Sequence, residues 1–267
     1  MAKGFRKSRL AFWSIICLGV LLSVLLWIRD RNYPIYIPII ASTLALLIGF
    51  FAACVVRNLV ANSLTTQYLG YLHMDLDPDK FIDAFGPVPG RLTKGSRDCA
   101  VAHAYLADGY GAKGDFATAL SLLEKGFHKA DLSDTALHGL YLSSKGVYQS
   151  AMGDLVQAQE TATSLRQLID GCWRSKNALA RNLQDSWLLL DADIALQEDR
   201  LPDKKALEEL YGRCAYNLRR FEIDRLLTLR ALAVGDKVEA KKHLELLKKH
   251  GGKTRYTAWA EEKLKAC

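Results

Sequence analysis

Two long apolar runs without charge open the chain. The first extends from Leu10 to Ile28 and the second from Asn32 to Val56. A bilayer core about 30 Å thick needs roughly 20 helical residues, so each run is long enough to cross it. The backbone must form its own hydrogen bonds in lipid, which predicts two transmembrane helices over about 10–28 and 33–56. A cleaved signal peptide is disfavoured, because the first run lacks a small-residue cleavage site and a second run follows at once.

The second run carries a small residue at every fourth position. Residues four apart lie on one face of a helix, and small side chains let helices approach closely in lipid. We expect this face to contact the first span near Gly19 and Ser23, or to join two copies of the chain. The stripe consists of Ala41, Ala45, Gly49 and Ala53.

Basic residues flanking the two runs predict their orientation. Lys and Arg are enriched on the cytoplasmic side of short membrane loops. More of them precede the first run or follow the second than lie in the turn, so we expect a two-span protein of the cell membrane with both termini in the cytoplasm. Outside the turn they are Lys3, Arg6, Lys7, Arg9 and Arg57, and in the turn they are Arg29 and Arg31.

The rest of the chain has the pattern of helices. The only proline after residue 90 is Pro202, and long stretches are rich in Ala, Leu, Glu and Lys. These residues favour helices. A punctuated segment comes first, in which Asp77 and Pro78 are typical of a helix start. We therefore predict an all-α protein with a membrane anchor at 1–60, a connector with short helices at 61–96 and a helical domain at 97–267.

The stretch GYGAKG, from Gly109 to Gly114, matches the dinucleotide-binding fingerprint G-x-G-x-x-G. That fingerprint requires a buried strand before it and a helix after it. The preceding residues have no β-branched apolar run, and their apolar positions follow a 3.6-residue repeat. The glycines therefore indicate a helix end, and no nucleotide or other cofactor is expected.

The surrounding window, AVAHAYLADGYGAKGDFATALSLLEKG, resembles a tetratricopeptide repeat, a helix–turn–helix unit of about 34 residues. The resemblance extends over roughly 97–252 and implies an α-solenoid of about four helix pairs, one of them turning near Pro202. Glycine supplies the positive φ that stops a helix, and an acidic residue follows it in each of three turns. The turns are Gly114–Asp115, Gly153–Asp154 and Gly235–Asp236.

The same resemblance implies that the first helix of each pair lines a concave groove. The basic pair with which some family members hold a peptide carboxylate is missing from the first two units, so an apolar helix or extended segment of a protein fits the groove better. Arg225 would add a charge-assisted contact. The implied lining residues are Val101, Ala104, Asp108, Gly111, Leu140, Ser143, Val147, Ser150, Glu222, Arg225, Leu229 and Leu232.

The formal charge of +7 does not indicate nucleic-acid binding. Residues 1–63 hold seven Lys/Arg and one Asp, and the rest of the chain holds 29 basic and 28 acidic residues. The excess therefore belongs to the membrane anchor. Residues 204–267 form a basic third of net charge +7, which we interpret as solvated helix faces.

No catalytic or metal-binding constellation is present in the sequence. It contains no H-E-x-x-H, G-x-S-x-G or G-x-x-x-x-G-K-[ST] motif, and no C-x-x-C pair. Asp191 and Asp193 lie two apart and point to different faces of a helix, which favours solvated or capping carboxylates over an acid–base pair. We therefore expect neither an enzyme nor a metal site.

The prediction is a membrane-anchored scaffold that binds a protein or peptide next to the bilayer. The arrangement is similar to membrane-anchored repeat proteins of bacteria. The alternative is an accessory or regulatory subunit of a membrane enzyme or transport complex. A fold class alone does not choose between them.

Overall fold

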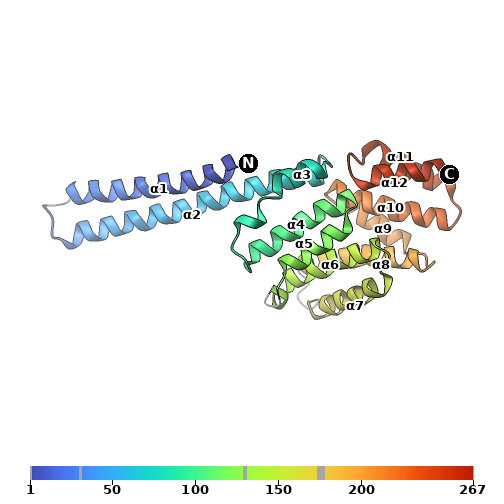
Figure 1. Cartoon of the computed structure of the whole chain (residues 1–267). Helices are drawn as coiled ribbons and strands as arrows, with labels where there is room; N and C mark the ends of the chain where they lie inside the picture. Colours follow the sequence, from blue (N-terminus) through green and yellow to red (C-terminus); the bar gives the residue numbers. More distant parts are fainter. Residues whose placement is uncertain (1, 30–31, 129–130, 173–177, 267) are drawn as a thin grey trace. The chain divides into compact units, whose positions relative to one another are not determined.

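Every element of regular structure in the described residues is a helix. The structure, a computed structural model, describes residues 2–29, 32–128, 131–172 and 178–266, so Arg31 and Cys267 lie outside it. The chain divides into two compact units, Met1–Tyr68 and Leu69–Cys267. The prediction of an all-α protein is confirmed for these residues (Figure 1).

The first unit is built from α1 (Ala2–Arg29) and most of α2 (Tyr36–His73), which run side by side (Figure 1). Phe12–Arg29 and Tyr36–Val56 are long and apolar enough to cross a membrane. Only 6% of each segment is buried. Their apolar side chains therefore face outward, unlike those of a core helix in a soluble protein.

The two helices approach most closely where glycines face each other. A β-carbon on Gly49 would lie 3.4 Å from the Gly19 Cα atom. The Ser42 hydroxyl donates a hydrogen bond to the Ser23 carbonyl, 3.2 Å away. Of the rest of the stripe, Ala53 is fully buried, and Ala41 and Ala45 are partly buried.

α2 ends later than the sequence predicted for the second span. It continues beyond Val56 to His73, because no proline occurs between Pro38 and Pro78 to interrupt it. About the first third of the expected connector, up to His73, is therefore helix. Two short helices follow, α3 (Pro78–Phe85) and η1 (Pro89–Arg91), and Asp77 caps α3 by accepting a 3.1 Å hydrogen bond from the Lys80 N–H.

The second unit continues as a succession of helices, each in contact with the next. Alternate helices also contact one another: α4 contacts α6, α6 contacts α8, α8 contacts α10 and α10 contacts α12. These five helices therefore form a continuous row. The helices are α4 (Arg97–Lys113), α5 (Phe116–Gly126), η2 (Asp131–Ser133), α6 (Thr135–Ala151), α7 (Leu155–Cys172), α8 (Ala178–Gln197), α9 (Lys204–Arg213), α10 (Asn217–Ala233), α11 (Lys237–His250) and α12 (Arg255–Ala266).

The three glycine–aspartate turns share one geometry. Gly114, Gly153 and Gly235 have φ of +95°, +82° and +76°, a left-handed conformation that ends each first helix. The aspartate that follows each glycine accepts a hydrogen bond from a backbone N–H three residues on and so caps the second helix. These bonds join Asp115 to Thr118, Asp154 to Gln157 and Asp236 to Glu239.

The other glycines of GYGAKG lie inside α4 and permit close packing. A β-carbon on Gly109 would lie 2.6 Å from the Phe81 ring, and one on Gly111 would lie 2.8 Å from the Tyr148 ring. Neither space accommodates a methyl group without movement. The stretch is therefore a helix with its C-terminal cap, not a strand–turn–helix.

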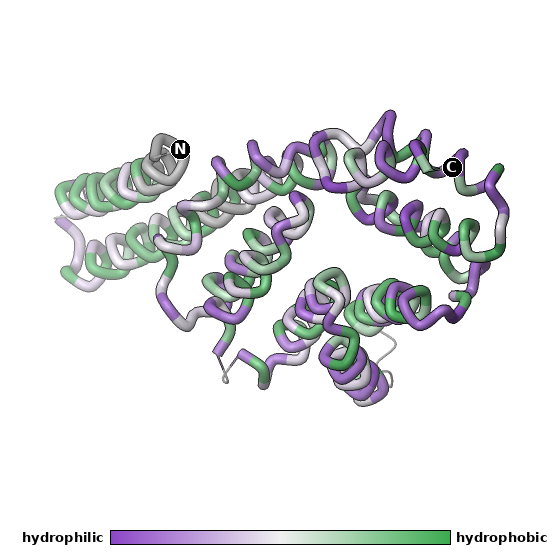
Figure 2. The backbone as a smooth tube through the Cα atoms, turned by 45° about the vertical axis from the view of Figure 1, so that its right-hand side comes forward, coloured by the Kyte–Doolittle hydropathy of each residue, from purple (hydrophilic) through white to green (hydrophobic). Residues whose placement is uncertain are grey.

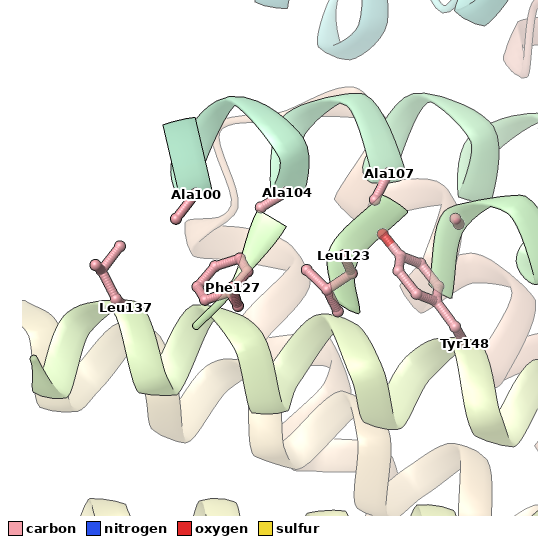
Figure 3. Packing of buried hydrophobic residues seen from close by; sticks show 8 residues of the cluster. Ala100, Ala104, Ala107, Leu123, Phe127, Leu137 and Tyr148 are labelled. Carbon is pink, nitrogen blue, oxygen red and sulfur yellow. The ribbon is translucent and has the colours of Figure 1, made fainter. Parts of the chain in front are cut away.

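Small residues also make the core between α4, α5 and α6. Ala100, Ala104 and Ala107 point from α4 toward a row of larger side chains, as Figure 3 shows, which consists of Leu137, Phe127, Leu123 and Tyr148. All three alanines are fully buried. The pairing of small with large side chains lets the helices pack closely.

The last helices of the second unit contact its first segments. Leu76 is buried in one cluster with Leu244 and Leu247, and the Lys253 N–H donates a 2.9 Å hydrogen bond to the Leu76 carbonyl. The Arg255 guanidinium lies 4.7 Å from the centre of the Phe116 ring. The C-terminal helices thus lie beside the segment that follows α2 (Figure 2), and the row of helices closes on itself.

We expect Gly49→Ile to weaken the pairing of α1 with α2, because the larger side chain would clash with Gly19. The test expresses residues 1–32 and 33–267 as separate chains and measures their co-purification from membranes. Gly70→Ile is the matched control, because a β-carbon at Gly70 meets nothing within 4 Å. Equal recovery of both variants would contradict the close contact.

Candidate functional site

A cleft of about 520 Å³ opens along the row of alternate helices in the second unit. We call it the central cleft. Its walls come from α6, α8 and α10, and Arg255 of α12 contributes to its rim. Apolar and charged side chains both face it, among them Val147, Leu196, Leu229, Asp193, Glu222 and Arg225.

A smaller pocket of about 280 Å³ adjoins the central cleft. We call it the inner pocket. It shares Val147, Asp193 and Glu222 with the central cleft, and α4 adds a further wall. Its other lining residues are Asp108, Leu140, Ser143, Ser144, Tyr148, Ser186, Leu189, Leu190 and Arg219.

Most of the expected groove residues lie on these two cavities. Asp108, Leu140 and Ser143 line the inner pocket, Ser150, Arg225 and Leu229 line the central cleft, and Val147 and Glu222 line both. They come together because alternate helices contact one another, so one face of each reaches the same space.

Four expected groove residues lie elsewhere. Ala104 is fully buried, and Val101 packs against the same core. Gly111 is buried against Tyr148, and Leu232 lines neither cavity. The first half of α4 packs into the core. Only its second half, at Asp108, reaches the site.

A cluster of buried charges joins α8, α10 and α12 beside the central cleft. Arg225 pairs with Asp193 and with Glu222, whose oxygen is 2.7 Å from its Nη2 atom. Glu222 also accepts hydrogen bonds from Arg255 at 2.9 Å and from the Tyr256 hydroxyl at 2.5 Å. Each of these ion-paired side chains is at most 20% exposed.

Glu222 and Arg225 remain ionised near neutral pH. Burial alone would raise the pKa of Glu222, but the positive charges of Arg225 and Arg255, with hydrogen bonds from Arg225 and Tyr256, lower it to about 2. The two carboxylates raise the pKa of Arg225 above its usual value, against the effect of burial. Arg225 is therefore already paired with Asp193 and Glu222. The charge-assisted contact of Arg225 with a partner, which the sequence predicted, would have to compete with both ion pairs.

Asp193 is part of this cluster and not a solvated or capping carboxylate, so the sequence-based interpretation of it is wrong. It is 8% exposed and accepts a 2.5 Å hydrogen bond from the Ser150 hydroxyl. Gln197, one turn further along α8, donates to the same carboxylate at 3.2 Å. The partners come from α6 and α10, which no pattern within α8 reveals.

Asp108 forms a second buried polar contact, at the inner pocket. Its carboxylate accepts a 2.7 Å hydrogen bond from the Tyr148 hydroxyl. Burial raises the pKa of Asp108 to about 6, and the hydrogen bond from Tyr148 opposes that shift without cancelling it. No ion pair of Asp108 occurs among the described residues, unlike the carboxylates of the charge cluster.

No sequence pattern singles out Arg219, Tyr148 or Arg255 as site residues. Arg219 lines the inner pocket, and its Nε and Nη2 atoms are buried without a hydrogen-bond partner. Its position beside Arg220 in α10 was the only signal, and that signal does not distinguish the two arginines. In the part of the chain that the structure describes, no three His, Cys, Asp or Glu side chains are placed to hold a metal ion.

Comparison with protein families, with characterised proteins and with solved structures finds no match for the chain.

We expect Asp108→Asn to stabilise the second unit at pH 7.5 and to have little effect at pH 4. Folded Asp108 holds its proton up to about pH 6, whereas an unfolded aspartate loses it near pH 4, so wild-type stability falls as the pH rises through that window. The variant lacks this loss and should gain about 1–2 kcal/mol at pH 7.5. Its amide oxygen can still accept from Tyr148.

Chemical denaturation of the full chain at the two pH values measures this difference. Asp83→Asn, an exposed position on α3, is the control and should show no comparable change. If the variant is less stable than the wild type at pH 7.5, or if its stability changes equally at both pH values, burial does not raise the pKa of Asp108.

Proposed function

We propose that the chain is a membrane-anchored scaffold with tetratricopeptide-like helix pairs, whose central cleft binds a partly apolar segment of a partner protein at the cytoplasmic face. The single observation that carries this proposal is the central cleft itself. It is lined by alternate helices of the second unit, the elements that line the groove in the family that the sequence resembles.

The exposed apolar surface of the first unit supports the membrane anchor. Large apolar side chains on both helices are more than half exposed, including Trp13, Leu18 and Phe51. Water would disfavour so much contiguous apolar surface, whereas lipid matches it. The basic residues that flank the spans favour an orientation with both termini in the cytoplasm.

The helix pairs of the second unit support the likeness to tetratricopeptide repeats. The left-handed glycine and the capping aspartate recur in the turns after α4, α6 and α10. The contact between the last helices and the first segments adds a feature that an open array of repeats would lack. Because contacts at Leu76 and Arg255 close the row of helices, the proposed site is limited in length. It would therefore bind only a short segment of the partner.

The lining of the central cleft indicates the chemistry of the partner. Glu222 and Asp193 are already neutralised by Arg225 and Arg255, so a highly charged segment would find no free ion of opposite sign there. Val147, Leu196 and Leu229 remain to bury apolar side chains. A peptide segment with one or two apolar residues therefore fits best.

Tethering makes weak binding sufficient. A partner confined to the same membrane meets the cleft at a high effective concentration, so a cleft of modest area can still be occupied. We therefore place the partner at or near the bilayer. This also explains the combination of a short membrane hairpin with a helical domain in one chain.

The orientation can be tested by cysteine labelling in intact cells. A cysteine introduced at Asn32, in the turn between the spans, should react with a maleimide that does not cross the membrane. One introduced at Lys94 should react only after the cells are permeabilised. Reaction at Lys94 in intact cells would overturn the proposed orientation.

We expect Leu229→Asp to reduce partner binding at least about fivefold, because a carboxylate would replace apolar surface in the cleft. The full chain would be cross-linked in membranes of its own cell, and the recovery of each co-purified protein measured. Leu232→Asp is the matched control, one turn along α10 and outside both cavities.

Circular dichroism separates the two explanations for lost binding. Unchanged helicity with lost recovery would support the cleft, whereas lost helicity would place Leu229 in the core. Equal recovery with Leu229→Asp and the wild type, at intact helicity, would show that the cleft does not bind the partner.

A further inference from the structure

We propose that the inner pocket binds a carboxylate group through the guanidinium of Arg219, together with a short apolar body of a few carbon atoms. The carboxylate belongs to a small organic acid or to an acidic side chain of a bound protein. In the second case the inference rests on the proposed function, because the inner pocket would then bind one acidic side chain of the partner segment.

Arg219 is the arginine at this site that has no carboxylate. Arg225 pairs with Asp193 and Glu222, and Arg255 pairs with Glu222. The Nε and Nη2 atoms of Arg219 are buried and have no hydrogen-bond partner. Among the described residues, no salt bridge includes Arg219, although three carboxylates line the same pocket.

The two unpartnered atoms form one edge of the guanidinium. The N–H groups on that edge are parallel and spaced to meet both oxygens of one carboxylate. Leaving these two N–H donors buried without partners is costly, because they have left water and gained no hydrogen bond in return. A bound carboxylate would accept hydrogen bonds from these atoms and remove this cost, which favours binding of such a ligand.

The free edge of Arg219 is buried, so the side chain must turn for that edge to meet a ligand. Arg219 is partly exposed as a whole, and within the described part of the chain neither its Nε nor its Nη2 atom has a hydrogen bond that a rotation would break. It already lines the inner pocket. Binding therefore requires a rotation that brings the free edge of Arg219 from its buried position into the pocket.

The walls of the inner pocket define the rest of the ligand. Leu140, Val147 and Leu189 supply apolar surface. The volume of about 280 Å³ is at the lower limit for organic ligands. It admits a short aliphatic acid or one side chain, and it excludes a whole helix.

The neighbouring carboxylates select against multiply charged ligands. Asp193 and Glu222 are neutralised by Arg225 and Arg255. Asp108 has no cation beside it, and its hydrogen bond comes from the neutral Tyr148 hydroxyl. A second negative charge on the ligand would meet Asp108, so we assign the pocket to a single carboxylate.

The test uses butyrate and its neutral amide, butyramide, which have nearly the same shape. Binding to the full chain in detergent is measured by isothermal titration calorimetry and by thermal unfolding, with ionic strength matched by sodium chloride. We expect millimolar butyrate to bind and to raise the unfolding temperature. Butyramide should do neither, because it cannot form the charged, two-pronged hydrogen bond.

Two variants separate Arg219 from its surroundings. Arg219→Gln should weaken butyrate binding about tenfold or more, since a hydrogen-bonded charge is lost. Arg220→Gln is the matched control, because Arg220 is the next residue but lines a different cavity. It should leave butyrate binding unchanged.

A measurement without ligand keeps the inference testable if the glutamine variant folds poorly. Arg219→Met retains the apolar length of the side chain and removes the unpaired buried charge. We expect its unfolding temperature to equal or exceed that of the wild type. A lower value would mean that Arg219 stabilises the free protein, and it would overturn the argument for an unpaired charge.

A capped peptide distinguishes the two sources of the carboxylate. Acetyl-Leu-Glu-Leu-amide carries a single side-chain carboxylate, and its glutamine analogue carries none. Binding of butyrate and of the glutamate peptide would assign the pocket to an acidic side chain. Binding of butyrate alone would assign it to a free organic acid.

Equal responses to butyrate and butyramide, or equal butyrate binding by the wild type and Arg219→Gln, would overturn the inference. The proposed function fails separately. If Leu229→Asp still releases the partner while butyrate does not bind, the central cleft retains its role and only the inner pocket loses its ligand.

Discussion

The close approach of helices, made possible by residues with little or no side chain, is the constraint on which the rest of the structure depends. In the first unit it joins α1 to α2 at Gly19 and Gly49. In the second unit it brings α4 against Phe81 and Tyr148 at Gly109 and Gly111. A methyl group at either α4 position would force these neighbours apart. The spacing of α4 and α6, and with it the width of the inner pocket, would then change.

The buried charge cluster fixes the other side of the site. Glu222 holds Arg225 within α10 and Arg255 from α12, while Arg225 also reaches Asp193 in α8. Such a cluster adds little stability relative to apolar packing, but losing one member leaves the others buried and unpaired. Its effect is therefore geometric, because only one arrangement of these helices satisfies every member. The central cleft keeps a defined shape while remaining open to a ligand.

Arg219 differs from its neighbours in lacking a partner, and that difference separates a structural charge from a binding group. Arg225 and Arg255 are occupied within the protein, and Arg219 is not. The same α10 helix therefore supplies both, one helical turn and a half apart. A cleft with apolar side chains on its walls, beside an unpaired cation, is suited to recognising a segment or molecule that combines apolar surface with a negative charge.

The sequence by itself determined the local structure of this protein. Helix composition, the apolar runs and the glycine–aspartate turns depend on residues near one another, so their periodicity and capping rules apply before any folding. The extension of α2 to His73 was missed because the end of the apolar run at Val56 marks the end of the hydrophobic span and not the end of the helix. The face of each first helix that lines the site was largely predictable, from Asp108, Val147 and Leu229.

Only the tertiary structure decided how those faces are used. Asp193 is buried by Ser150 and Arg225, 43 and 32 residues away. The contact of Lys253 with Asp77 bridges 176 residues and helps close the row of helices. The state of Arg219 depends on which carboxylates its neighbours already occupy. Such competition among distant charges is a property of the packed chain, and no local pattern contains it.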